Sequence, residues 1–136
     1  MAFVLDASIA IAWVVPTQSN AYAKRVRLLA RHEPFHVPSI FNAEIANVLV
    51  ALERRGILSA HGAETAASVL SRLEPVVHEL DLTIVQLRAI AVRFGLSAYD
   101  ASYLALALDA NLPVACGDRP LKAALSKAGV KLFATR

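Results

Sequence analysis

Short apolar runs alternate with longer amphipathic segments along this chain. Ala2 to Leu5 is an apolar run rich in strand-forming residues, and Asp6 follows it directly. Similar short runs stand at 35–37, 76–80, 112–116 and 131–133, each next to Pro, Gly or Asp punctuation. Runs of this length with such boundaries indicate buried strands.

The segments between these runs have the periodicity and boundary residues of helices. Helices are predicted at 9–15, 20–31, 40–55, 59–73, 83–94, 96–108 and 120–128. Ser8, Ser39 and Ser59 are expected to cap the helices that follow them, and Thr83 with Gln86 has the spacing of a capping box. Strands that alternate with helices predict an α/β fold: a three-layer sandwich with a central, mostly parallel sheet flanked by helices, in one domain over residues 1–136.

Composition decides whether this apolar chain is a membrane protein. Its 136 residues are 57% hydrophobic, yet the longest apolar stretches, 9–15 and 101–108, fall short of the ~20 residues that a spanning helix needs. No membrane span is expected, and Asp6 would fall inside the apolar core of a secretory signal, which argues against such a signal. The one cysteine, Cys116, cannot form an internal disulfide, which fits a reducing cytoplasm.

The balance of charge is mildly basic, at +3. Such a balance is compatible with a polyanionic partner. Lys24, Arg25, Arg27 and Arg31 spread over the helix predicted at 20–31. That helix is either an ordinary solvated surface or a contact for RNA.

Four acidic residues occupy positions that do not suit a solvated carboxylate. Asp6 and Asp118 each follow an apolar run, at the strand end where open α/β sheets hold ligands. Glu44 lies within the apolar stripe of its helix. Asp100 lies in the first turn of a helix that is apolar nearly all round.

Each of these acids also has a structural interpretation. Asp6 and Asp118 can cap helices, and Asp100 has capping-box spacing with Ser97. Glu44 can bury its stem and reach a neighbouring arginine. Sequence spacing alone leaves these alternatives open.

If the four acids do meet, their repulsion requires a cation. Each like-charged pair about 4–6 Å apart costs roughly 3–4 kcal/mol at an effective dielectric constant of 20. Carboxylate oxygens favour Mg²⁺ or Mn²⁺ over zinc. The sequence offers no zinc alternative, because it has one cysteine and no helical pair among His32, His36, His61 and His78.

Four motifs together carry a family resemblance over essentially the whole chain. They are Asp6-Ala7-Ser8 with Trp13 and Pro16; Pro38 with Glu44 and Asn47; Ser97-Ala98-Tyr99-Asp100-Ala101 with Tyr103 and Ala105; and Pro113 to Leu121, which contains Asp118. In this set and order the chain resembles the PIN-domain ribonucleases, and specifically looks like a VapC-type toxin of bacterial toxin–antitoxin pairs. The fold expected from the resemblance is therefore PIN-like.

The resemblance implies a metal-dependent endoribonuclease that hydrolyses RNA phosphodiester bonds. Asp6, Glu44, Asp100 and Asp118 would be its catalytic residues and would hold one or two Mg²⁺ or Mn²⁺ ions. Ser8, Asn47 and Ser97 would support them. The resemblance also implies a cytoplasmic homodimer and a VapB-type antitoxin that forms a hetero-oligomer with it and blocks the acidic pocket.

One position departs from the family pattern. Cys116 stands two residues before the last acid, where the family often has Thr or Ser. A thiol is a weaker hydrogen-bonding group than a hydroxyl. This departure bears on the role of Asp118 and on whether a second metal binds.

Two other functions compete with this interpretation. A phosphatase-like hydrolase would use Asp6 as its nucleophile, but Ser8 stands where such enzymes usually carry a second Asp. A non-catalytic binding module would use the acidic pocket to hold a structural ion or an arginine of a partner.

Overall fold

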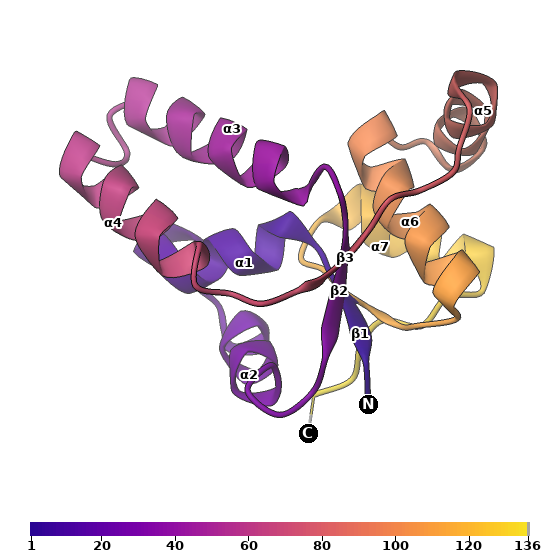
Figure 1. Cartoon of the computed structure of the whole chain (residues 1–136), viewed down its shortest axis with the longest axis horizontal. Coiled ribbons are helices and arrows are strands. Elements are labelled where there is room, and N and C mark those ends of the chain that lie inside the picture. The colour runs from indigo at the N-terminus through magenta and orange to yellow at the C-terminus, as the bar shows by residue number, and fades with distance from the viewer. Residues whose placement is uncertain (136) are drawn as a thin grey trace.

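The computed structural model describes residues 1–135. Strands and helices alternate in the predicted order: β1 (Phe3–Leu5), α1 (Ala7–Val14), η1 (Pro16–Gln18), α2 (Ala21–Leu29), β2 (Phe35–Pro38), α3 (Phe41–Arg54), α4 (Ala60–Leu70), β3 (Val76–His78), α5 (Ile84–Phe94), α6 (Ala98–Ala110), β4 (Val114–Ala115) and α7 (Arg119–Ala128). Figure 1 shows the sheet edge-on, with α1 to α4 on one side and α5 to α7 on the other. The predicted three-layer α/β sandwich is confirmed.

The sheet is parallel throughout its four strands, in the order β3-β2-β1-β4. Phe3 pairs with Phe35 of β2, and Leu5 pairs with Ala115 of β4. Because β1 is central and its three residues are buried, its apolar run is covered on both faces. All strand carboxyl ends therefore lie at one edge of the sheet.

The prediction of a strand at 131–133 is wrong. This segment forms a single bridge, between Val114 and Leu132, and no ladder within the described residues. Phe133 instead turns into the core, where its ring stacks on Phe3 with centroids 4.2 Å apart. Packing of this aromatic side chain replaces further pairing along β4.

Two predicted helix caps are also wrong. Asp6, not Ser8, is the N-cap of α1, because its backbone is extended and its carboxylate accepts from the Ser8 N–H. The N-cap of α3 is Ile40, with no side-chain hydrogen bond, while the Ser39 N–H donates to the His78 carbonyl of β3. The predicted caps at Ser59 and Thr83 are confirmed, the latter as a complete capping box.

Helix α6 has the longest unbroken run of buried residues in the described part of the chain. Its residues from Ala101 to Ala107 are buried without interruption, and it packs against β1, β2 and β4. A helix that is apolar on every side requires such cover. Its first turn, which carries Asp100, is therefore fixed relative to the sheet. Within residues 1–135, every helix falls short of the length and apolar content needed to cross a bilayer.

We expect Phe133→Ala to lower the stability of the domain by about 3–5 kcal/mol, the usual cost of removing a buried aromatic ring. Phe133 is 4% exposed, whereas the neighbouring Leu132 is 42% exposed. Leu132→Ala is the matched control and should cost under about 1 kcal/mol. Thermal melts of the two variants check this prediction. Equal melting temperatures would contradict the assignment of Phe133 to the core.

Candidate functional site

All four acids singled out in the sequence lie where a helix begins. Asp6 is the N-cap of α1 and follows β1; Asp118 is the N-cap of α7 and follows β4. Glu44 and Asp100 lie in the first turns of α3 and α6. Figure 1 shows α1, α3 and α6 beginning around the same, upper end of the sheet. Parallel strands bring these helix starts to one edge.

Asp6 is the most buried of these acids, with a side chain only 2% exposed. Its carboxylate accepts hydrogen bonds from the N–H and the hydroxyl of Ser8. Burial raises the pKa of Asp6 to about 6, against the lowering by Ser8, and the charges of Glu44 and Asp118 raise it further. The ionised form of Asp6 is therefore destabilised in the metal-free protein.

Glu44 projects from α3 into the same half-buried space. The Tyr103 hydroxyl of α6 donates to Glu44 Oε1 over 2.7 Å. Burial raises the pKa of Glu44, Tyr103 lowers it, and the charges of Asp100 and Asp118 raise it again. Glu44 is thus coupled to acids from two other helices.

Asp100 and Asp118 are neighbours in the folded protein. Burial raises the pKa of Asp100 to about 6, and the charges of Asp6 and Asp118 add to the rise. Each acid is at the same time tied to a helix start: Asp100 N–H donates to Ser97 Oγ, and Asp118 Oδ2 accepts from Leu121 N–H.

No lysine or arginine within residues 1–135 forms an ion pair with any of the four acids. The ion pair found in that range joins the N-terminal ammonium to Glu33. The sequence alternative in which Glu44 reaches a neighbouring arginine is therefore wrong. Partial positive charge comes instead from the helix N-termini, each worth about 0.3–1 kcal/mol to an adjacent carboxylate. That is small beside the roughly 3 kcal/mol repulsion of one close pair.

The three predicted supporting residues have different surroundings. Ser8 joins two parts of the site, because its Oγ donates to Asp6 and accepts from the Gly117 N–H. Ser97 caps α6 beside Asp100. Asn47 is exposed on α3, and the described structure records no side-chain hydrogen bond for it. The structure thus brings Ser8 and Ser97 against the acids, and the supporting role of Asn47 stays a prediction.

Cys116 lies in the core beside the acids and is fully buried. Burial raises the pKa of its thiol to about 12, and the negative charges of Asp6, Asp118 and Asp100 contribute to this rise. The thiol therefore stays protonated near neutral pH, and a protonated thiol is a poor metal ligand. The donor set is left as carboxylate oxygens, which are the ligands that hard cations such as Mg²⁺ and Mn²⁺ prefer.

The four acids lie near one another, but their oxygens do not yet surround one common position. Within residues 1–135, no three His, Cys, Asp or Glu side chains already stand at the spacing of metal ligands. Three carboxylates accept hydrogen bonds from protein donors: Asp6 from Ser8, Glu44 from Tyr103 and Asp118 from the Leu121 N–H. Side-chain rotations within the group would be needed for several of the acids to share an ion. Their role as metal ligands stays a prediction.

The structure also pairs two histidines that the sequence left apart. His36 Nδ1 and His78 Nε2 are 2.8 Å apart, on the neighbouring strands β2 and β3. Burial, then the nearby His78, lowers the pKa of His36. The parallel register that creates this pair cannot be deduced from helical spacing. The histidines do not enter the interactions of the four acids.

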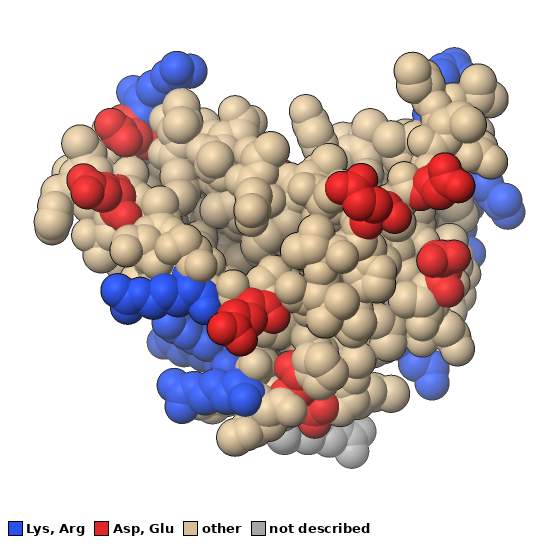
Figure 2. Space-filling model, viewed as in Figure 1, with Lys and Arg blue, Asp and Glu red and all other residues tan. Residues whose placement is uncertain are grey.

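The basic helix α2 lies away from the acids. Figure 1 places α2 beside the opposite end of the sheet, near both chain termini, and Figure 2 shows basic side chains gathered there. Arg25 and Arg27 hydrogen-bond within the fold, to Thr135 Oγ1 and to the Trp13 carbonyl. Arg119 and Lys122, in the first turn of α7, are exposed basic residues much closer in sequence to Asp118.

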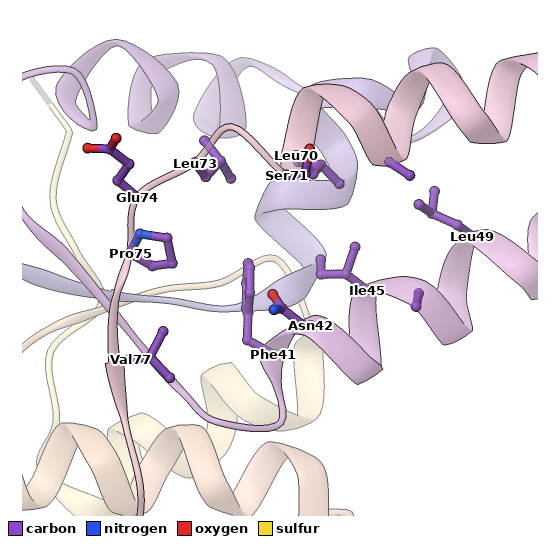
Figure 3. Close-up of a pocket in the computed structure, with 12 residues that line it drawn as sticks. Phe41, Asn42, Ile45, Leu49, Leu70, Ser71, Leu73, Glu74, Pro75 and Val77 are labelled. Atoms are coloured by element: carbon purple, nitrogen blue, oxygen red, sulfur yellow. The ribbon is translucent and has the colours of Figure 1, made fainter.

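A separate apolar groove of about 460 Å³ lies between α3 and α4. Phe41, Ile45 and Leu49 line it from α3, and Leu70 faces them from α4, as Figure 3 shows. None of the four acids lines the groove. Phe41 nevertheless lies one turn from Glu44 on the same helix. The groove therefore begins next to the acidic edge.

The known proteins to which this chain is similar include PIN-domain proteins and VapC ribonucleases. The PIN domain family model matches residues 3–124. VapC ribonuclease Mb0985 of Mycobacterium bovis is 34% identical over 119 residues, which cover 85% of this chain and 84% of that protein. Ribonuclease VapC3 of Pyrobaculum aerophilum is 30% identical over 112 residues, covering 79% and 82% of the two chains.

Two solved structures share the fold. PAE2754 from Pyrobaculum aerophilum superposes with a TM-score of 0.69 at 24% identity, over 91% of this chain and 79% of that one. VapBC2 from Rickettsia felis, bound to a DNA fragment from their promoter, gives a TM-score of 0.65 at 19% identity, over 98% of each chain.

The raised pKa of Asp6 predicts an unusual pH dependence of metal-free stability. Asp6 holds its proton more tightly folded, with a pKa of about 6, than unfolded, near the ordinary 3.8. Stability should therefore rise as pH falls from above 6 towards 4, by on the order of 2–3 kcal/mol from this residue. Thermal melts in EDTA at about pH 7.5 and about pH 5 measure the change.

Asp6→Asn should remove the part of this pH dependence that comes from Asp6 and leave the part that comes from Asp100, whose pKa is also raised to about 6. The variant should be at least as stable as the unmodified protein near neutral pH, because Asn also caps helices well. Asp81→Asn, at an exposed position between β3 and α5, is the matched control and should keep the dependence. A large loss of stability in Asp6→Asn near neutral pH would show instead that the carboxylate stabilises the fold.

Proposed function

The chain belongs to the PIN-domain family and is of the VapC type, and on that premise we propose that it is an endoribonuclease toxin that depends on Mg²⁺ or Mn²⁺. One observation carries the proposal: four carboxylates at helix N-termini act on one another, and none has a basic partner within residues 1–135. Such a group costs stability unless a cation joins it. Residues 1–136 would act as one domain.

In this proposal Asp6, Glu44, Asp100 and Asp118 hold the cation. Bound there, the ion supplies positive charge beside the scissile phosphate and lowers the pKa of the attacking water. Ser8 hydrogen-bonds to both Asp6 and the Gly117 backbone, and so fixes their positions relative to each other. One of these carboxylates would accept a proton from that water.

RNA must reach the acidic edge although its own phosphates are repelled there. Arg119 and Lys122 are exposed at the start of α7, whose N-cap is Asp118. Side chains in this position would neutralise phosphates on either side of the cleaved bond. We assign them this role in preference to Lys24 on α2 and Arg31 just after that helix, because α2 lies by the other end of the sheet.

No observation in the described structure favours the alternative in which Asp6 is the nucleophile of a phosphatase. A nucleophile has to meet its substrate, but Asp6 is 2% exposed and accepts two hydrogen bonds from Ser8. The surrounding negative charges would also oppose the approach of a phosphate without a cation. A metal-dependent nuclease accounts for the same buried acids, because a bound cation would offset their negative charges.

An antitoxin is the partner of a VapC-type toxin, and we place it in the groove between α3 and α4. The groove offers apolar side chains for the partner to cover, and its end at Phe41 is one turn from Glu44. A segment lying in it could therefore reach the unpaired acids with a basic side chain. We also propose that the toxin forms homodimers and acts in the cytoplasm, where RNA and antitoxin are made.

Cleavage of a labelled RNA tests the proposed activity. We expect cutting with Mg²⁺ or Mn²⁺ and none in EDTA. Asp100→Asn and Asp6→Asn should lower the rate at least about 100-fold, because each removes a negative charge from the ion's ligand set. Asp81→Asn should cut normally. Folded, antitoxin-free protein that cuts no RNA with any divalent cation would favour the non-catalytic binding module.

Substitutions in the groove test the site of the antitoxin. Ala46 and Ala51 are both exposed on α3, but only Ala46 lines the groove. Ala46→Glu should weaken binding of the co-expressed antitoxin at least about tenfold, because it puts a charge against apolar contacts. Ala51→Glu should bind normally. Equal recovery of antitoxin with both variants would move its site elsewhere.

A further inference from the structure

Tyr103 is a fully buried residue whose polar group is aimed at the candidate site. It lies on α6 one turn after Asp100, with none of its surface exposed. Its hydroxyl donates to Glu44 Oε1 over 2.7 Å, across 59 positions of sequence. The sequence motif includes Tyr103, but spacing along α6 gives no indication of this contact.

The same hydroxyl lies near the start of α1. The backbone N–H of Ala7 is close enough to the Tyr103 oxygen to lower the pKa of its hydroxyl, against the larger rise from burial. Ala7 is the first residue of α1 and directly follows Asp6. The phenol of α6 therefore lies between the start of α1 and the carboxylate of α3, to which it donates.

Tyr22, which is half-buried, shows what a phenol with a structural role does in this fold. Tyr22 donates to the backbone carbonyl of Phe133 over 2.8 Å, and so holds α2 to the C-terminal segment. Its partner is a backbone group of the core. Tyr103 instead donates to a carboxylate that shares a space with three other acids.

We infer that Tyr103 is a positioning residue, which holds Glu44 in the orientation that a divalent cation requires. This inference rests on the proposed metal-dependent function. A free glutamate side chain samples many rotamers, and ordering it on binding costs conformational entropy. The bond to Oε1 orders it in advance and leaves Oε2, for which the described structure records no hydrogen bond, to face the ion. Partners of this kind commonly change metal affinity by about 10–100-fold.

Calorimetric titration of the full chain with Mn²⁺, without RNA, tests the inference. Tyr103→Phe removes the hydroxyl and keeps the ring, so we expect Mn²⁺ binding about tenfold weaker than in the unmodified protein. Tyr22→Phe is the matched control: it also removes one half-buried phenol hydrogen bond, and it should bind Mn²⁺ normally. Thermal melts in EDTA record how much stability each variant loses.

A double-mutant cycle separates positioning from a general effect on folding. If Tyr103 acts through Glu44, then Tyr103→Phe should change Mn²⁺ affinity less than about twofold in a Glu44→Gln background. Affinity unchanged by Tyr103→Phe alone, or a tenfold loss that persists in the Glu44→Gln background, would overturn the inference. Unmodified protein that binds no Mn²⁺ would overturn the proposed function itself, and the inference with it.

Discussion

Mutual repulsion among carboxylates is the constraint on which this structure depends. Asp6 and Asp100 have pKa values raised to about 6, and burial is the largest cause for both. The fold spends stability to keep these acids together, since a protein selected only for stability would pair or expose them. Helix N-termini reduce the cost, because every one of the four acids stands at or within the first turn of a helix.

Capping and chemistry are combined at these positions. Asp6 accepts from the Ser8 N–H, and Asp118 accepts from the Leu121 N–H, so both are true helix caps. Both also act electrostatically on the other acids. Capping fixes each carboxylate near the end of its strand, and the parallel sheet fixes the strand ends relative to one another. A local interaction thereby supplies the precision that a shared site needs.

The polar contacts of the site connect elements that are distant in sequence. Ser8 Oγ accepts from the Gly117 N–H, and Tyr103 donates to Glu44, so the α1, α3, α6 and α7 starts are joined in pairs. The apolar groove on the α3–α4 side shares only helix α3 with this network. A partner bound in the groove and an ion bound among the acids would therefore meet at the start of α3. Under the proposed function, one helix would serve both catalysis and its inhibition.

The sequence by itself determined the alternation of strands and helices, the α/β class and the identity of the unusual acids, because these depend on periodicity, capping and turn residues that act over a few positions. It did not determine that 131–133 forms only one bridge, that Ile40 rather than Ser39 begins α3, or that His36 meets His78. Those features follow from packing and from strand register. The Tyr103–Glu44 bond was equally hidden, since it joins residues brought together by two helices on opposite faces of the sheet. Only the tertiary structure could decide which polar groups meet, because contacts between distant segments depend on how every intervening element packs.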